Sequence, residues 1–218
     1  MNKVVALLGG NRAADAFRKT VSGDPTGAPA WAQQMAIGND VGLFGPESAV
    51  WEVHGSISTL VGGIRALLMQ AAHPAALTGV AEHSQYDTDP LGRLERTTRW
   101  LTITTFGSTE AIEREARRVN ELHSHVKGEY PAKDGKAAPY SARDARHLLW
   151  VHCAFTDSFL RAQIELGYPI ALGADRYVQE WAKSAVPLGL NNAPQSALEL
   201  KETIAGFVVN EVEAIAMT

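Results

Sequence analysis

Residues 71–100, AAHPAALTGVAEHSQYDTDPLGRLERTTRW, contain two of the joints that divide this chain into helices. Proline favours the first turn of a helix and disfavours helical geometry in the residue before it. Pro74 therefore begins a new helix, and His73 lies at the joint. Further along, Asp89 is a typical helix cap and Pro90 a typical first-turn residue, so another helix is predicted to begin there.

The same signals recur along the rest of the chain and predict an all-α fold. Helices are expected to begin at cap residues or prolines and to end at glycines. The expected helices cover residues 46–55, 58–73, 74 onward, 90–107, 108 to about 128, 141–167, 175 onward, and 196 to the C-terminus. The clearest loop is KGEYPAKDGKAAPY, residues 127–140, which is rich in glycine, proline and lysine. The final segment, VVNEVEAIAMT, carries no helix-stop signal, so we expect the fold to continue beyond it.

The composition is that of an ordinary globular protein. The 218 residues are 45% hydrophobic and 20% charged, with a net charge of −4 and interspersed acids and bases. This balance favours one globular helical domain over residues 1–218 and gives no basic footprint for nucleic acid. The single cysteine, Cys153, excludes an intramolecular disulfide and permits a reducing compartment. Because no apolar run has the length of a signal-peptide core or a membrane span, we expect a soluble, cytoplasmic protein, with its oligomeric state left open.

Two histidines occupy slots in apolar helical stripes. After Ser108 the stripe runs in steps of four and three through Ile112, Ala116, Val119, His123 and Val126. His123 therefore faces the core, whereas His125 falls on a solvated face. After Ser141 a second stripe contains Ala145, Leu148, Leu149, His152, Phe155 and Phe159. A buried imidazole must be neutral and hydrogen-bonded, or must bind a ligand. The first interpretation leads for His152, and the second gains weight for His123.

A cationic cluster in the preceding helix favours the interpretation that His123 binds a ligand. RLERTTRW, residues 93–100, places Arg93, Arg96, Thr97 and Trp100 on roughly one helical side, and Ile103 continues the same line. One interpretation is a solvated charged face. The other is a pocket floored by Trp100, in which the guanidinium groups bind carboxylates or donate hydrogen bonds to a ligand. Just upstream, Glu82, His83 and Asp87 are candidates for the anions or for an acid–base group.

Several familiar site motifs are absent from the sequence. There is no HExxH zinc motif, no ExxH pair of a di-iron bundle, no CxxC, no Walker loop, no GxSxG and no dinucleotide-binding GxGxxG. A single imidazole in an otherwise apolar helical slot is a different arrangement. A haem requires one imidazole for its iron, apolar walls for the macrocycle and cations for the propionates, so the pattern is coherent with a haem pocket.

An ordered set of segments resembles one known family. The set, in chain order, is GPESAVWEVHG, VGGIRALLMQAAHPAALTGVAEHSQYDTDPLGRLERT, FGS, VNELHSHVKG, YSARDARHLLWVHCAFTDS and DRYVQEW. Together these segments resemble the catalytic domain of rubber oxygenase, or latex-clearing protein, a family that also contains the oxygenase of mycophenolic acid biosynthesis. The resemblance covers roughly residues 40–200.

The resemblance implies an all-helical domain with a globin-like core around haem b, and an oxygenase that cleaves carbon–carbon double bonds. By pattern, His123 matches the proximal iron ligand of the family. The family's Arg-x-x-Lys-Thr cluster matches Arg93, Arg96 and Thr97, with arginine in place of the lysine. An arginine keeps its proton and offers no lone pair, so Arg96 cannot close the iron site as a lysine would.

We therefore expect a haem b-dependent oxygenase acting with dioxygen on a small apolar molecule, isoprenoid or lipid-like and possessing a double bond. Arg96 and Thr97 are expected to hydrogen-bond the oxygen, and Glu82 or His83 to move a proton. The predicted cofactor-binding residues are His123, Arg93, Trp100, His152 and His73. Two alternatives stay open: a haem-binding protein without turnover, and a haem-free helical module that binds a small acidic ligand through Arg93 and Arg96.

Overall fold

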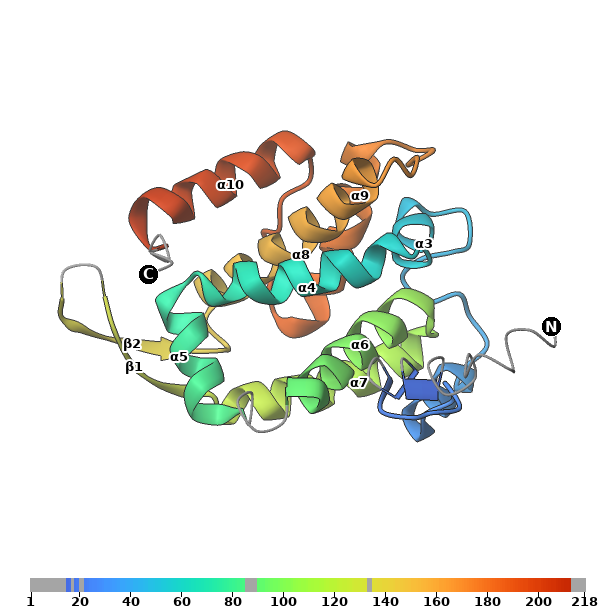
Figure 1. Ribbon diagram of the computed structural model, residues 1–218, viewed down its shortest axis with the longest axis horizontal. Helices are drawn as coiled ribbons and strands as arrows, with labels where there is room; N and C mark the ends of the chain where they lie inside the picture. Colours follow the sequence, from blue (N-terminus) through green and yellow to red (C-terminus); the bar gives the residue numbers. More distant parts are fainter. Residues whose placement is uncertain (1–14, 17, 20–21, 85–89, 133–134, 213–218) are drawn as a thin grey trace. The chain divides into compact units, whose positions relative to one another are not determined.

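The computed structural model confirms the all-α fold class, with helices throughout and one small hairpin of strands (Figure 1). It describes residues 15–16, 18–19, 22–84, 90–132 and 135–212. The chain divides into two compact units: unit 1 comprises Met1–Gly42 and Ser84–Glu115, and unit 2 comprises Leu43–His83 and Ala116–Thr218. The single domain and the globin-like core stay predictions.

Unit 1 is organised around the helix that begins at Pro90. Its elements are η1 (Ala30–Ala36), α6 (Pro90–Phe106) and the first part of α7 (Thr109–His125). Trp31, Ile103 and Ala111 form its apolar cluster. The fully buried Glu115 carboxylate accepts a hydrogen bond of 2.9 Å from Arg99 Nε, and Arg99 also donates to Gln34. Because a buried carboxylate is stable only when it is paired, the contact between Arg99 of α6 and Glu115 of α7 stabilises the packing of these two helices.

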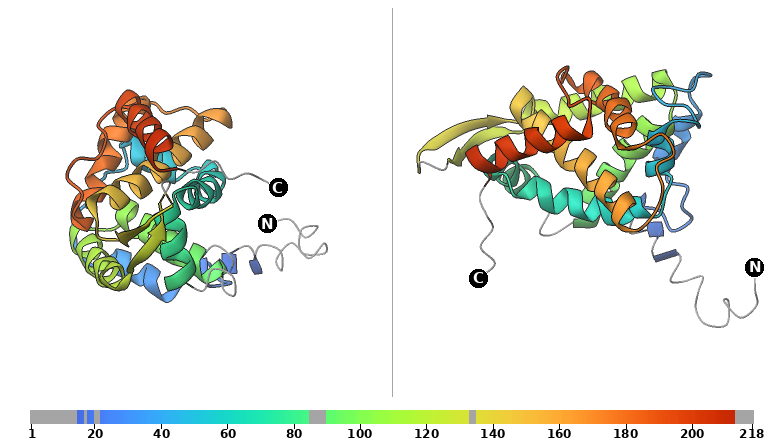
Figure 2. Two further views of the ribbon diagram at one scale, coloured as in Figure 1. Left: turned by 90° about the vertical axis from the view of Figure 1, so that its left-hand side faces the viewer. Right: turned by 90° about the horizontal axis from the view of Figure 1, so that it is seen from above.

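Unit 2 contains the remaining elements. They are α3 (Ala49–His54), α4 (Ser58–Ala71), α5 (Pro74–His83), the end of α7, β1 (Lys127–Pro131), β2 (Ala137–Ser141), α8 (Ala145–Glu165), α9 (Ala174–Trp181), η2 (Ala182–Leu188) and α10 (Ala197–Asn210). The long helices α4 and α8 lie side by side, and α10 packs against α8 (Figures 1 and 2). As predicted, the chain breaks between α4 and α5 just before Pro74.

Small residues bring α4 close to α8. The buried residues of α4 are Ser58, Gly62 and Ala66. A Cβ atom added to Gly62 would lie 2.7 Å from Phe159 Cδ1 and 3.0 Å from Phe159 Cα, so glycine is required for this approach. Helical spacing predicts one apolar face through Leu60, Ile64, Leu67, Leu68 and Ala71. Ile64 and Leu68 instead point away from α8 and are 60% and 67% exposed.

Two adjacent glycines of α4 give a matched test of this packing. We expect Gly62→Ala to lower the free energy of unfolding by about 2 kcal/mol, because the clash with Phe159 outweighs the helix propensity of alanine. Gly63→Ala should instead raise it by about 0.5–1 kcal/mol, since a Cβ there meets nothing within 4 Å. Urea denaturation measures both. If the two variants shift stability equally, the close approach of α4 and α8 is wrong.

The segment predicted to be a loop is a β-hairpin, so that prediction was wrong. Strands β1 and β2 pair antiparallel with Gly128 opposite Tyr140, and α7 ends at His125, short of Gly128. Alternate residues of β1 are more buried, which is the period of a strand with one covered face. The glycine and prolines that suggested a loop are tolerated because, among the described residues, neither strand has a neighbour on its outer edge. Figures 1 and 2 show the hairpin projecting past the ends of α5 and α10.

Most predicted helix ends are confirmed by cap contacts. Ser196 accepts the Glu199 N–H at 3.1 Å at the start of α10, as predicted. The helix predicted from residue 141 begins only at Ala145, because Ser141 ends β2, and its cap is Asp144, which accepts the Arg146 N–H at 2.8 Å. Asp175 was expected to cap α9. It lies instead in the first turn of that helix and accepts the Ala197 N–H at 2.8 Å. The prediction failed because the side chain serves a neighbouring helix rather than its own.

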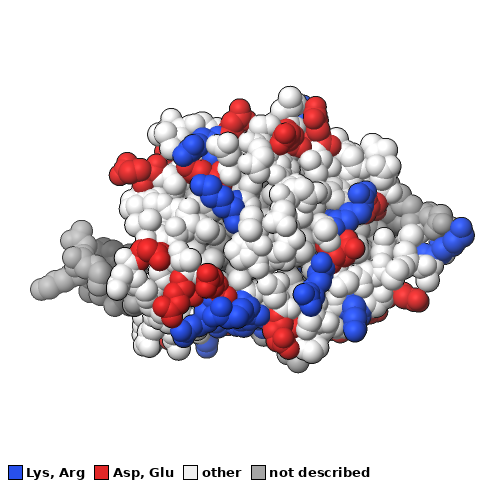
Figure 3. All heavy atoms as spheres, turned by 180° about the vertical axis from the view of Figure 1, so that it is seen from behind, with Lys and Arg blue, Asp and Glu red and all other residues white. Residues whose placement is uncertain are grey.

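Two other helix ends differ from the sequence prediction. The first described helix of unit 2 begins at Ala49 after the cap Ser48, three residues later than Pro46. Helix α10 ends at Asn210, and residues 213–218 of the expected continuation lie outside the described part of the chain. Among the described residues, no helix combines the length and hydropathy needed to cross a bilayer. Seen from behind, basic and acidic side chains are interspersed (Figure 3).

Candidate functional site

The end of α7 positions His123, the predicted iron ligand. Its ring Nδ1 is buried and has no hydrogen-bond partner within the described residues. Burial lowers the pKa of His123, and the positive charges of Arg118 and Arg143 lower it further. The ring is therefore neutral near pH 7. On the other face of the helix, the exposed His125 lies 3.3 Å from Glu121, as predicted.

His152 in α8 has a similar unsatisfied nitrogen. Its Nε2 is buried and, within the described part of the chain, makes no hydrogen bond. Burial lowers the pKa of His152 to about 4, so this imidazole is also neutral. The sequence interpretation of His152 as a hydrogen-bonded core residue requires a partner for this nitrogen, and the described residues provide none. Each of these two neutral rings keeps a lone pair on one nitrogen, which is the donor that iron or another metal takes.

His73 differs because both of its ring nitrogens are satisfied. Nδ1 accepts the Ala75 N–H at 3.2 Å, and Nε2 lies 3.0 Å from a Glu211 carboxylate oxygen. These contacts define one neutral tautomer, with the proton on Nε2. Burial is the main cause that lowers the pKa of His73 to about 4, followed by the nearby His147 and Arg146. His73 thus lies at the joint between α4 and α5 with both ring nitrogens in contact with protein groups, and its predicted role in cofactor binding stays a prediction.

Glu82 and His83, the predicted proton-transfer pair, lie where α5 meets the hairpin. The Tyr140 hydroxyl donates a 2.6 Å hydrogen bond to Glu82 Oε2, and His83 Nε2 donates to the Lys127 carbonyl at 3.3 Å. Burial and the Glu82 carboxylate raise the pKa of Tyr140 to about 12. A Cβ at Gly128 would lie 3.0 Å from the Glu82 carboxylate, so the strand passes close to this carboxylate.

Removing the Tyr140 hydroxyl tests this contact. We expect Tyr140→Phe to lower the free energy of unfolding by about 1 kcal/mol, because a charge-assisted hydrogen bond to an exposed carboxylate is lost. Tyr168→Phe is the matched control, since Tyr168 is exposed and should change stability by less than about 0.5 kcal/mol. Thermal or urea unfolding gives both values. Equal effects of the two variants would show that Tyr140 does not hold Glu82.

The predicted cationic cluster lies on α6 in unit 1. Arg93, Thr97 and Trp100 are half-buried, whereas Arg96 is exposed. Burial lowers the pKa of Arg93, and the like charge of Arg96 contributes. The Thr97 hydroxyl donates to the Arg93 carbonyl at 3.1 Å, one helical turn back.

His123, Glu82 and His83 belong to unit 2. Because the cationic cluster belongs to unit 1, the grouping of all these residues into one site stays a prediction.

Sequence reasoning missed His54 in α3. Its Nε2 lies 3.0 Å from the Tyr177 hydroxyl, and its ring packs edge-on against Phe159 and Trp181. Burial lowers the pKa of His54 to about 3. The signal was present, since His54 follows the buried Val50 by four residues on one helical face.

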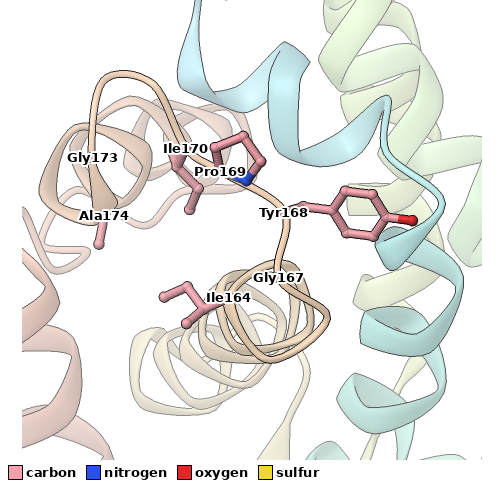
Figure 4. Close-up of a pocket in the computed structure, with 7 residues that line it drawn as sticks. All are labelled: Ile164, Gly167, Tyr168, Pro169, Ile170, Gly173 and Ala174. Atoms are coloured by element: carbon pink, nitrogen blue, oxygen red, sulfur yellow. The ribbon is translucent and has the colours of Figure 1, made fainter.

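A hollow of about 410 Å³ was also missed. It lies between the end of α8 and the start of α9 and is lined by Ile164, Gly167, Tyr168, Pro169, Ile170, Gly173 and Ala174 (Figure 4). Its lining side chains are almost all apolar. In the described part of the chain, no three or more His, Cys, Asp or Glu side chains gather in a way that could hold a metal ion.

Comparison with known proteins identifies the class of the domain. Residues 51–218, more than half of the chain, match the family described as ER-bound oxygenase mpaB/B'/Rubber oxygenase, catalytic domain. The chain therefore belongs to this family of oxygenases, as the ordered sequence segments predicted. No curated protein and no solved structure gives a significant match to the chain.

Proposed function

We propose that this protein is a haem b-dependent oxygenase that acts with dioxygen on a small, apolar, unsaturated molecule of isoprenoid or lipid-like character. Membership of the oxygenase family supports the reaction class. The proposal of a haem cofactor rests on the buried nitrogen of His123, which lies on an otherwise apolar helical stripe and has no partner among the described residues. An unsatisfied buried nitrogen costs free energy unless something binds it, and iron is a suitable acceptor of its lone pair.

The residues present fit a haem in their donor chemistry. His123 would hold the iron, and His152 is the second candidate because its Nε2 is also unsatisfied. Arg93, half-buried on α6, would neutralise a propionate. A bound haem would supply the iron at which dioxygen is activated for double-bond cleavage. This reaction needs no outside reductant, since one C=C bond and one O₂ molecule give two C=O groups.

The chain's own side chains would stabilise charge and move protons. The Arg96 guanidinium would donate hydrogen bonds to negative charge on the reacting oxygen. Thr97 can join it only by releasing the Arg93 carbonyl to which its hydroxyl now donates. The Glu82 carboxylate lies at the end of α5, where it already accepts a hydrogen bond from the Tyr140 hydroxyl. It is the better candidate for proton transfer, because His83 commits its Nε2 to a carbonyl.

The purified chain, supplied with hemin, tests the proposal in two measurements. A Soret band and a stoichiometric titration report binding. Oxygen consumption with squalene, compared with the saturated squalane of the same skeleton, reports double-bond cleavage; carbonyl products should form from squalene alone. Haem binding without oxygen consumption with any alkene favours the alternative of a carrier or sensor. No haem binding favours the haem-free module that uses Arg93 and Arg96 for an acidic ligand. A cytoplasmic location stays a prediction.

A further inference from the structure

Helix α4 exposes a row of large aliphatic side chains along the face opposite α8. Four residues form this row, which we call the α4 seam: Ile57 at the N-cap (61% exposed), then Val61 (50%), Ile64 (60%) and Leu68 (67%) within the helix. They follow one another in steps of four, three and four. This spacing is that of a seam at which two helices pack side by side, and it is narrower than the apolar face of a helix that covers a core.

The seam is free of ionisable groups. Arg65 is the single charged residue of α4, and it turns toward α8. Its guanidinium lies 2.6 Å from the Asp157 carboxylate and donates to the Ser158 hydroxyl at 2.7 Å. The charge of Arg65 is therefore neutralised within unit 2, which leaves the seam purely apolar.

The apolar surface continues from the start of the seam onto the loop between α8 and α9. Ser58, beside Ile57, donates to the side chain of Gln163, whose amide donates to the Pro169 carbonyl at 2.9 Å. These bonds hold the loop beside α4. In Figure 4 the Tyr168 ring extends from the loop toward the segment that joins α3 and α4. The large apolar residues of the loop region are 41–52% exposed: Ile164, Leu166, Tyr168 and Leu172.

The area of this surface matches one side of a protein interface. The exposed surface of these eight residues sums to roughly 700–800 Å², which is of the order of the contact area of one partner. A standard interface buries about 800 Å² per partner. A membrane is the less suitable partner, because interfacial helices place lysine and arginine along the polar face, and the one basic residue of α4 is ion-paired.

We propose that this protein forms a homodimer in which the α4 seam of one copy packs against the α4 seam of a second copy, antiparallel about a two-fold axis. A two-fold interface is self-complementary, so an apolar row pairs with itself without charge matching. The loop around Tyr168 extends the contact at each end of the paired helices. This assembly is independent of haem binding and of the oxygenase activity.

Sedimentation equilibrium of the full chain over a micromolar concentration series tests the dimer. The wild type should be dimeric, and Ile64→Glu should raise the dimer dissociation constant by about 100-fold or more, because the new charges face each other across the axis. Val186→Glu is the matched control, since Val186 is 54% exposed on η2, outside the seam, and should leave the dimer intact. A monomeric wild type, or a dimer that Ile64→Glu leaves unchanged, overturns the proposal.

Cysteine crosslinking gives a second measurement that does not depend on the glutamate variant folding. The native thiol, Cys153, is buried, so it should not crosslink. Ile64→Cys should form a disulfide-linked dimer under mild oxidation, because residues near a two-fold axis meet their own copies. A monomer that instead sediments with phosphatidylcholine vesicles, and no longer does so as Ile64→Glu, would show that the seam binds lipid and that the dimer proposal is wrong.

Discussion

Replacing His123 by alanine is expected to abolish stoichiometric haem binding by the chain. Loss of an outer-shell partner of a metal ligand weakens metal affinity about 10–100-fold, so loss of the ligand itself should weaken it by more than about 100-fold. The expectation rests on the neutral ring of His123 and its buried, unpartnered Nδ1. Hemin titration followed at the Soret band measures the effect, and circular dichroism checks that the variant keeps its helices.

Three other histidine variants make this result specific. His125→Ala should bind haem like the wild type, because His125 is exposed two residues away on the other face of α7. His73→Ala should also bind haem, although it should lose stability, since both nitrogens of His73 already have partners. Haem retained by His123→Ala and lost by His152→Ala would move the ligand to α8, where His152 Nε2 is the second unsatisfied histidine nitrogen among the described residues.

Local signals in the sequence were sufficient for most of the helices. A cap such as Asp144 or Ser196 forms its hydrogen bonds within three residues, so its effect can be read from neighbouring positions. The joint at Pro74 is local for the same reason, since proline restricts the backbone of its own and the preceding residue. The solvated position of His125 also followed from helical spacing alone.

Features set by distant contacts could not be predicted in this way. Asp175 caps nothing in α9, because it accepts a hydrogen bond from Ala197, 22 residues away in sequence. The outward direction of Ile64 is set by the close packing of Gly62 against Phe159 of α8, a contact between residues that are far apart in the sequence. The hairpin was hidden because its pairing joins strands separated by a turn, and its glycine and prolines are typical of loops.

The candidate site shows the same division between local and distant information. Spacing identified His123 and His152 as inward positions, and their buried nitrogens agree with that. It could not show that the Tyr140 hydroxyl, contributed by β2, holds the Glu82 carboxylate of α5. It also could not show that the Thr97 hydroxyl is already engaged with its own helix.

Acid is expected to destabilise the haem-free protein strongly between pH 6.5 and pH 5. His54 and His73 are buried and neutral, with pKa values lowered to about 3 and about 4 from an ordinary value of 6.5. The unfolded chain therefore binds protons in this window that the folded chain does not, so the stabilisation is complete above pH 6.5 and declines as the pH falls. Each histidine should remove about 1.4 kcal/mol per pH unit, or about 2 kcal/mol by pH 5.

Urea denaturation at a series of pH values, with single-histidine variants, separates this effect from general acid denaturation. His54→Gln should flatten the dependence of the unfolding free energy on pH by the share of one histidine, because glutamine does not titrate. A His54→Gln profile with the slope of the wild type would mean that His54 takes up a proton in the folded protein. The packing of His54 against Tyr177 and Trp181 predicts that its ring stays uncharged, and such a profile would contradict this.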